Sequence, residues 1–429
     1  MNLSKLLINT AEVIRPVLTK LLPKKLLSDI KARVVAKASA GVSESDYEAY
    51  DPSAFMPGVN LIGNIRGDNG LGEMCRIHAK TLETGKIPYT IKNFFVPPGG
   101  SKTNHTMDEK ITDTTPYQVN VISVNASEFV LANMQMGNDI WNKHYNIGYW
   151  AWEMEEFPEE WMPAFELCQE VWSISDFETQ ALRKFTHKPV MTVPLCIEAP
   201  TSEEYDRAYF GLPEDEFLFL VVFASGSVME RKNPVAAIKA FVQAFTGADA
   251  PKIQGKKPGL VIKINEMSFS EEDSAILTEL TKDVEHVHII PKNVSKLEIN
   301  SLIRDVDVYV SLHRAEGFGL VLAEAMYVGT PTIATKYSGN LEFQNDEVAC
   351  LVGYDRIPLE QDMPPFKKGY LWADAHVDEA AAYMRKLYVE SDYYASIRDR
   401  AYSHVRNHLS YERCAGLVKA RLEQIMNTP

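Results

Sequence analysis

The sequence predicts an α/β protein of two domains, each built on a mostly parallel sheet. Short apolar runs alternate with helical patterns along most of the chain, which is typical of strands joined by crossover helices. The run 217–223 is continuously apolar, as expected for a strand that is buried on both faces. The length of 429 residues fits two domains of roughly 150 to 200 residues each.

The first half of the chain carries the elements of one such domain. We predict strands at 59–62, 89–93, 119–124, 146–150, 170–174 and 190–193, with helices between them that include 71–82. Glycines follow the first strand at Gly63, Gly67, Gly70 and Gly72. Prolines, acidic residues and a glycine then gather between 194 and 212, where we expect the hinge. This gives an arm and linker at 1–50, a first domain at 51–200 and a second domain at 201–409.

The second half carries the most informative segment. Strands are predicted at 217–223, 260–264, 287–290, 306–312 and 332–335, and the end of the chain, 378–426, is helical. Between the last two strands lie Glu316, the turn Gly317-Phe318-Gly319, and a helical pattern that contains Glu324 and ends at Gly329. A helix that begins behind a glycine turn offers backbone N–H groups to a phosphate.

The two glutamates would flank that anion site. A carboxylate repels phosphate but accepts hydrogen bonds from hydroxyls, so one glutamate suits a ribose and the other a sugar. Arg231 and Lys232 precede a helix that begins near Pro234, and charged hydrogen bonds to phosphate oxygens are strong. The simplest ligand is a nucleotide-diphosphate sugar. The alternative is an ordinary strand–helix–strand unit whose charged side chains are solvated.

These motifs resemble those of the retaining glycosyltransferases of family 4, which have the GT-B fold. The resemblance runs from about Gly58 to the C-terminus. It implies two Rossmann-like domains that face a cleft, with the final helix, about 410–429, crossing back onto the first domain. It also implies a metal-independent, hexosyltransferase-type enzyme with no cofactor, whose donor substrate contains UDP, GDP or dTDP.

The resemblance also assigns roles to residues. The catalytic set is Glu316, Lys232 and Arg231. The acceptor set is Asn125, Trp152 and Glu153. The last two come from an aromatic and acidic stretch at 149–161, whose rings and carboxylates suit sugar rings and hydroxyls and whose tryptophans are otherwise expected to fill the inter-domain core. The donor-binding set is Gly70, Gly72, Gly317, Phe318, Gly319, Leu320, Glu324, Lys263 and Asn293.

The chain departs from the family at two positions. Many relatives have an arginine five or six residues before the lysine, where this sequence has Gly226 and Ser227, so Arg231 would have to compensate. A histidine that often follows a strand of the first domain is replaced by Asn125. The alternatives to a glycosyltransferase are an inactive nucleotide-sugar-binding partner of another transferase and a GT-B-fold nucleotide-sugar epimerase.

The remaining expectations, on partners, metals and cysteines, come from the composition and charge of the chain. Net charge is −14, which argues against nucleic-acid binding, and no His, Cys and carboxylate cluster has metal-ligand spacing. The five scattered cysteines suit reduced thiols in a cytoplasm. Residues 1–40 hold eight basic and two acidic side chains in an amphipathic helical pattern. Such a helix suits an anionic membrane surface or packing on protein, including a second copy of the chain.

We therefore expect a transferase that acts on a glycan or lipid-linked acceptor in bacterial surface polysaccharide synthesis. Its expected location is the cytoplasm, peripheral to the inner face of the cytoplasmic membrane.

Overall fold

The computed structural model describes residues 43, 46–95, 102–224, 229–247, 250–251, 255–265, 271–282 and 284–427. The basic arm predicted at 1–40, and Gly226 and Ser227, lie outside these residues. The chain forms two compact units. Unit 1 comprises the residues up to Trp152, Phe157–Cys196 and Tyr411–Pro429, and unit 2 comprises Glu153–Glu156 and Ile197–Ser410.

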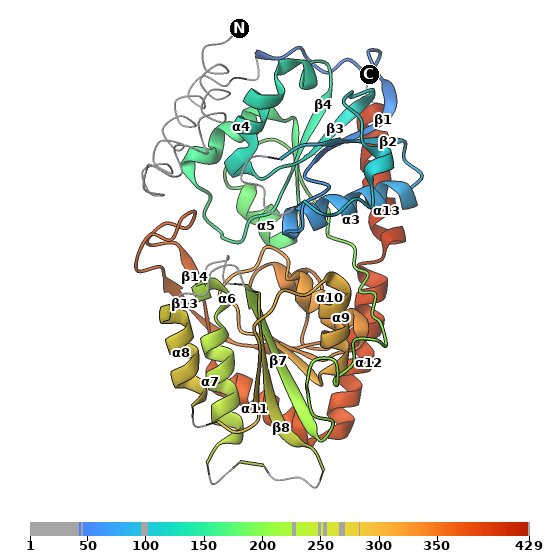
Figure 1. The fold of residues 1–429 in the computed structure, drawn as a ribbon. Helices are drawn as coiled ribbons and strands as arrows, with labels where there is room; N and C mark the ends of the chain where they lie inside the picture. Colours follow the sequence, from blue (N-terminus) through green and yellow to red (C-terminus); the bar gives the residue numbers. More distant parts are fainter. Residues whose placement is uncertain are drawn as a thin grey trace. The chain divides into compact units, whose positions relative to one another are not determined.

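Unit 1 is built on a six-stranded parallel sheet with the order β2-β1-β3-β4-β5-β6 (Figure 1). Its apolar strands lie inside, with Leu61 and Val121 fully buried. The elements are β1 (Met56–Gly63), α3 (Gly70–Thr84), β2 (Tyr89–Asn93), η2 (Asp108–Lys110), β3 (Tyr117–Ser123), α4 (Ala126–Met136), η3 (Asn138–Ile140), β4 (Tyr145–Trp150), η4 (Glu159–Leu167), β5 (Glu170–Ser173), α5 (Asp176–Leu182), β6 (Val190–Thr192) and α13 (Tyr411–Met426).

The C-terminal helix α13 packs against α3 within unit 1. Its Arg421 forms an ion pair with Glu170 of β5, with 2.6 Å between Nη2 and Oε2. The Glu170 side chain is fully buried and also accepts hydrogen bonds from Trp172 and Tyr145. A buried carboxylate that lost this cation would be costly, so the pair fixes α13 on the sheet.

Unit 2 has a second six-stranded parallel sheet, with the order β12-β11-β10-β7-β8-β9. Helices α7, α8 and α11 form one layer, and α9, α10 and α12 form the other (Figure 1). The elements are β7 (Glu216–Ala224), α6 (Met229–Lys232), α7 (Pro234–Phe245), β8 (Lys257–Asn265), α8 (Glu271–Thr281), β9 (Val287–Ile290), α9 (Lys296–Asp305), β10 (Val308–Ser311), α10 (Leu320–Val328), β11 (Thr332–Thr335), η5 (Gly339–Glu342), β12 (Cys350–Val352), β13 (Tyr354–Pro358), β14 (Leu371–Ala375), α11 (Val377–Val389) and α12 (Ser391–His408).

Local sequence explains where the helices near the site begin. Before α7, the Asn233 side chain accepts a hydrogen bond from the Ala236 N–H, and Pro234 occupies the first helical position. Before α9, Ser295 and Glu298 form a reciprocal capping box. Both caps satisfy backbone N–H groups that the helices themselves leave without partners.

All the strands predicted from the sequence are present, and two parallel α/β sheets confirm the predicted fold class. The prediction missed β12, which has only three residues, and the antiparallel hairpin β13–β14. Strand β13 reads YDRIP, none of its residues is buried and it has no apolar face, so it lacks the pattern that reveals a strand.

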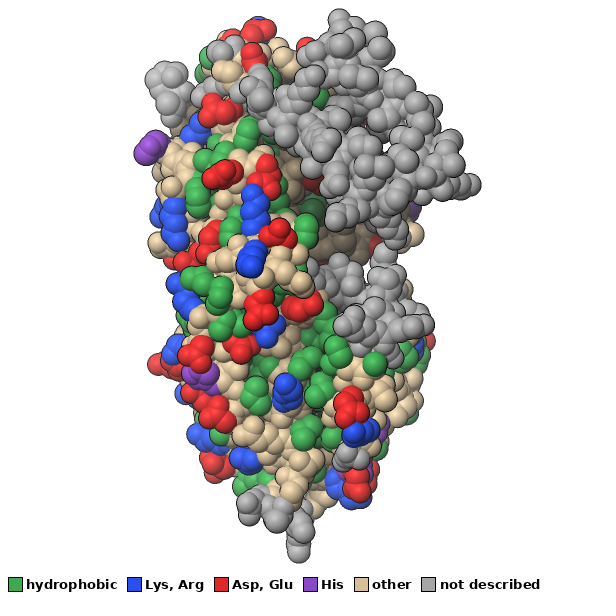
Figure 2. Space-filling view, turned by 90° about the vertical axis from the view of Figure 1, so that its left-hand side faces the viewer, with side chains coloured by type: hydrophobic (Ala, Val, Ile, Leu, Met, Phe, Trp, Pro, Cys, Tyr) green, Lys and Arg blue, Asp and Glu red, His purple; other side chains and the backbone are tan. Residues whose placement is uncertain are grey.

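The surface of the described residues is mixed in charge. Figure 2 shows acidic and basic side chains interspersed with apolar ones over one face. Among the described helices, none has the length and hydropathy needed to cross a membrane.

Candidate functional site

The candidate site of unit 2 lies where the order of the strands reverses. Strand β7 has β8 on one side and β10 on the other. In open α/β sheets, ligands bind beyond the carboxyl ends of the strands at such a point. Arg231 and Lys232 follow β7, and Glu316 follows β10, so the topology brings together two segments that are far apart in sequence.

Glu316 is the centre of a cluster of charges. Its Oε1 pairs with Lys232 Nζ, and its Oε2 lies 3.4 Å from Arg231 Nη1. Arg231 Nη1 also donates a 2.7 Å hydrogen bond to the carbonyl of Ala315. Arg231 Nη2 lies 3.6 Å from Oε1 of Glu153. The catalytic set named by the resemblance is therefore one contiguous group of side chains.

The cluster keeps Glu316 ionised. Only 8% of Glu316 is exposed, and burial by itself raises the pKa of a carboxyl group. The charges of Lys232 and Arg231 outweigh this effect and lower the pKa of Glu316 to about 2. Burial also lowers the pKa of Arg231, but Glu316 and Glu153 outweigh it, so its pKa is raised. Glu316 is therefore ionised at neutral pH.

A tight turn holds the backbone of Glu316. The Glu316 N–H donates a 2.9 Å hydrogen bond to Ser338 Oγ, and its carbonyl accepts a 2.8 Å bond from the Gly339 N–H. A Cβ on Gly339 would lie 2.0 Å from the Gly317 carbonyl oxygen. Ser338 has φ of 76°, which non-glycine residues rarely adopt. Such strain often marks a functional site.

The glycine turn leads directly into α10. Gly319 caps the helix in the left-handed conformation, with φ of 93°, and Leu320 is the first helical residue. Phe318 is buried against Phe343, with 5.1 Å between the ring centroids. The helix therefore begins directly after the turn Gly317-Phe318-Gly319, as predicted from the sequence. The N–H groups at this end suit an anion.

Glu324 lies one turn into α10 and is 3% exposed. Its Oε1 pairs with Lys296 Nζ, from the first residue of α9. The sequence prediction did not include Lys296. Asn293 is exposed in the loop between β9 and α9, in the segment that the resemblance assigns to the nucleobase.

The contacts of Lys263 are with backbone carbonyls of the protein itself. Its ammonium is fully buried and donates hydrogen bonds of 3.0 and 2.6 Å to the carbonyls of Ile264 and Lys292. Burial, with the nearby charge of Lys292, lowers its pKa to about 8. The bond to Lys292 joins β8 to the turn after β9, so a role of Lys263 in phosphate binding stays a prediction without further support.

A buried polar network beneath the turn was missed by the sequence analysis. His313 Nε2 lies 3.2 Å from both the Tyr337 carbonyl and Asn340 Oδ1. Asn340 Nδ2 donates to Gln344 Oε1, and Gln344 donates to Thr332 Oγ1. Burial lowers the pKa of His313. Such fully bonded networks rigidify a core and fix the loop above it.

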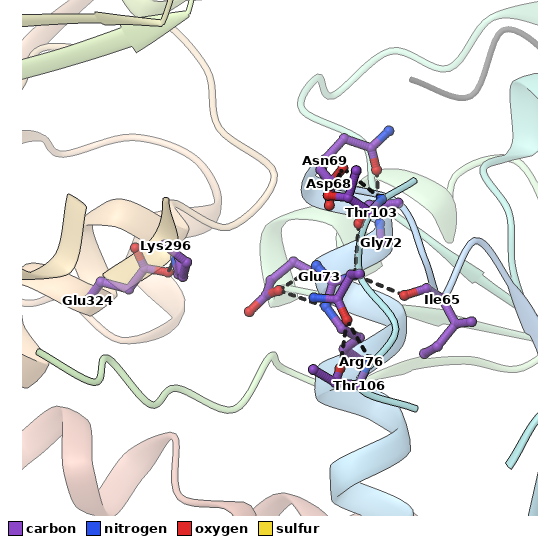
Figure 3. A network of polar contacts seen from close by, with 12 residues as sticks. Ile65, Asp68, Asn69, Gly72, Glu73, Arg76, Thr103, Thr106, Lys296 and Glu324 are labelled. Atoms are coloured by element: carbon purple, nitrogen blue, oxygen red, sulfur yellow. Dashed lines mark hydrogen bonds and ion pairs between the residues drawn. The ribbon is translucent and has the colours of Figure 1, made fainter. Parts of the chain in front are cut away.

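Unit 1 has its own reversal point, between β1 and β3. After β1, Asn69 accepts a 3.0 Å hydrogen bond from Gly72 N–H at the start of α3. Arg76 reaches back from α3 and donates to the carbonyl of Ile65 (Figure 3). It also donates to the carbonyl of Gly67. A Cβ on Gly72 would lie 2.1 Å from the Gly67 oxygen, so this tight loop requires glycine there, while Gly70 has open space.

The predicted acceptor residues do not form one group. Asn125 follows β3 and accepts a 3.0 Å hydrogen bond from the Ala151 N–H. Trp152 is 3% exposed and packs edge-on against Trp161, with 4.8 Å between centroids, in the aromatic interior of unit 1. Glu153 belongs to unit 2 and contacts Arg231. The tryptophan thus packs inside unit 1, and its role in acceptor binding stays a prediction.

The fold and this site define a class of protein. The structure resembles Anabaena HepE in complex with UDP-glucose, with a TM-score of 0.61 and 14% identity over 86% of this chain and 100% of that one. It resembles sucrose-phosphate synthase of Thermosynechococcus elongatus with the same TM-score and identity, over 86% and 99%. A glycosyltransferase of Rickettsia africae gives 0.60 and 12%, over 87% and 100%. The fold is that of the GT-B glycosyltransferases.

Two sequence comparisons also match glycosyltransferases. Residues 203–404 match the model of the family described as Glycosyl transferases group 1. A D-inositol 3-phosphate glycosyltransferase of Arthrobacter sp. (strain FB24) is 25% identical over 152 residues, which is 34% of this chain. The match spans about a third (33%) of that relative's length. Membership of family 4 itself stays a prediction.

Proposed function

We propose that this chain is a retaining glycosyltransferase that moves a sugar from a nucleotide-diphosphate sugar to a glycan or lipid-linked acceptor. The observation that carries the proposal is the ionised, buried Glu316 paired with Lys232 beside the start of α10. A cation and a helix N-terminus at the reversal point of the sheet suit a diphosphate. The adjacent carboxylate suits the hydroxyls of a sugar.

In this proposal the site stabilises the leaving group. Departure of the nucleoside diphosphate builds negative charge on its terminal oxygen, and Lys232 with the N-terminal N–H groups of α10 opposes that charge. Glu316 orients the donor sugar, and Glu324 binds the ribose hydroxyls. The leaving phosphate takes the proton of the acceptor hydroxyl on the same face of the sugar, which gives retention of configuration. Asn125 remains a proposed acceptor contact.

The donor class can be tested by binding. Calorimetric titration of the full chain with UDP, GDP, dTDP and ADP, each with and without its common sugars, should reveal selective micromolar binding of one nucleotide. The binding of UDP-glucose by HepE makes the uridine series the first to titrate. If no nucleotide binds, the transferase proposal fails, and the alternative of a protein with a degenerate site takes its place.

The setting is also proposed. We infer a location at the inner face of the cytoplasmic membrane, because the basic segment 1–40 suits anionic lipid headgroups. A role in bacterial surface polysaccharide synthesis is proposed from the resemblance to family 4 alone. Deletion of residues 1–40 should weaken binding to anionic liposomes and leave binding to neutral liposomes unchanged. Equal binding of the deleted and full chains to anionic liposomes would instead favour the packing of this segment on protein.

A further inference from the structure

The acidic segment Glu153–Glu156 is anchored on unit 2 by its carboxylates. Glu155 Oε1 accepts a 2.8 Å hydrogen bond from Arg356 Nη2 and lies 3.4 Å from the Tyr337 hydroxyl. Glu156 Oε1 accepts a 3.3 Å bond from the Leu371 N–H. With its neighbours held in this way, Glu153 reaches the catalytic cluster and approaches Arg231.

Glu153 changes the charge balance of the cluster. Arg231 lies between two carboxylates, at 3.4 Å from Glu316 and 3.6 Å from Glu153, while Lys232 pairs with Glu316. The four side chains therefore carry two positive and two negative charges. The guanidinium is 8% exposed and also holds the Ala315 carbonyl. Arg231 is thus engaged with groups of the protein itself.

We propose that Glu153 is a specificity residue of the donor site, which makes the site select donors with an uncharged sugar over nucleotide-activated uronic acids. The inference rests on the proposed function, in which Glu316 holds the donor sugar. A uronic acid would bring a third carboxylate to a guanidinium that already faces two. Such like-charge juxtaposition is how binding sites reject a competing ligand.

The effect should be large because the cluster is shielded from water. Interactions between charges a few ångströms apart are several times stronger in a partly buried site than in bulk water. Glu153 is itself partly exposed, with 27% of its side chain accessible, so salt should weaken the discrimination. Without the carboxylate of Glu153, less of the positive charge of Arg231 would be neutralised by the protein. Arg231 could then attract the carboxylate of an acidic sugar.

The test compares two donors that share a nucleotide. Calorimetry would measure the Kd of UDP-glucose and UDP-glucuronate, or of GDP-mannose and GDP-mannuronate if the chain selects guanosine. We expect the wild type to favour the neutral sugar by about tenfold or more. Glu153→Gln, which keeps the size of the side chain, should reduce that ratio by about threefold or more. Glu214→Gln, an exposed glutamate just before β7, is the matched control and should leave the ratio unchanged.

Three results would overturn the proposal. The wild type could bind both donors equally, the ratio in Glu153→Gln could equal that of the wild type, or Glu214→Gln could change it as much. The wild type also provides a test that needs no variant. Its preference for the neutral sugar should fall as the salt concentration is raised. Failure of the proposed function would give other results. No nucleotide would bind to the wild type, or Lys232→Ala would bind the nucleotide as tightly as the wild type does.

Discussion

At the scale of single residues, the site depends on a carboxylate that stays charged although it is buried. Glu316 is stabilised by Lys232 and Arg231, and its backbone is fixed by Ser338 and Gly339. The three charged side chains come from segments that follow two neighbouring strands. A donor that enters this site exchanges water for groups that are already oriented, which is the basis of electrostatic preorganisation.

Lys232 should contribute to the binding of the donor diphosphate. Lys232→Ala should weaken the binding of the selected nucleoside diphosphate by about 1.5 to 3 kcal/mol, the cost of a lost charged hydrogen bond. Lys239→Ala, an exposed lysine on the following helix α7, is the control and should leave the Kd unchanged. Calorimetry gives both values, and an unaltered Kd in Lys232→Ala would remove this lysine from the site.

Glu316 should also make stability depend on pH. Its pKa is about 2 in the folded chain against an ordinary value of 4.5. A carboxyl whose pKa is lowered by folding adds stability above its ordinary pKa and loses it as the pH falls toward the folded value. The gap in unfolding free energy between the wild type and Glu316→Gln should therefore be constant from about pH 7 to 5 and shrink below about 4.5. Urea titrations would measure it, and a gap that widens in acid would contradict the assignment.

Some residues of the site could be predicted from sequence and others could not. Glu316, Lys232 and Glu324 stand in local motifs whose spacing to strands and turns indicates their position. Lys263 also lies near the end of a strand, but the Lys292 carbonyl that accepts its 2.6 Å hydrogen bond becomes a neighbour only through the fold. The same holds for Glu153, whose contact with Arg231 joins segments that no local pattern connects.

At the scale of elements, the turn between β11 and β12 supports the loop of Glu316. The turn contains Ser338, Gly339 and Asn340, and tertiary contacts account for the last two. Gly339 is needed because the Gly317 carbonyl lies where its Cβ would be. Asn340 is needed because its amide joins His313 to Gln344 beneath the turn. Both reasons are tertiary contacts, which a local pattern cannot contain.

This account predicts opposite effects for two glycine substitutions. Gly339→Ala should force the loops apart, lowering the unfolding free energy by about 2 kcal/mol or more and weakening nucleotide binding. Gly416→Ala, in helix α13 with nothing within 4 Å of its added Cβ, should raise stability by about 0.5 to 1 kcal/mol. Chemical denaturation measures both, and a neutral Gly339→Ala would show that the turn can move freely.

At the scale of the whole molecule, the alternation of apolar runs and helical patterns was enough to predict two parallel α/β sheets. It could not predict the order of the strands in each sheet, which depends on long-range pairing. It also missed the hairpin β13–β14, whose strand β13 lacks an apolar face. The assignment of Glu153–Glu156 to unit 2, apart from the strand that precedes them, is likewise visible only in three dimensions.

The most direct test of the central claim is turnover of the donor. The measurement is the release of nucleoside diphosphate from the selected nucleotide sugar by the wild type, by Glu316→Gln and by the exposed control Lys239→Ala. We predict that Glu316→Gln remains folded but loses at least about a hundredfold in kcat, because it no longer holds the sugar as charge develops. The control should match the wild type. Full turnover by a folded Glu316→Gln would contradict the account.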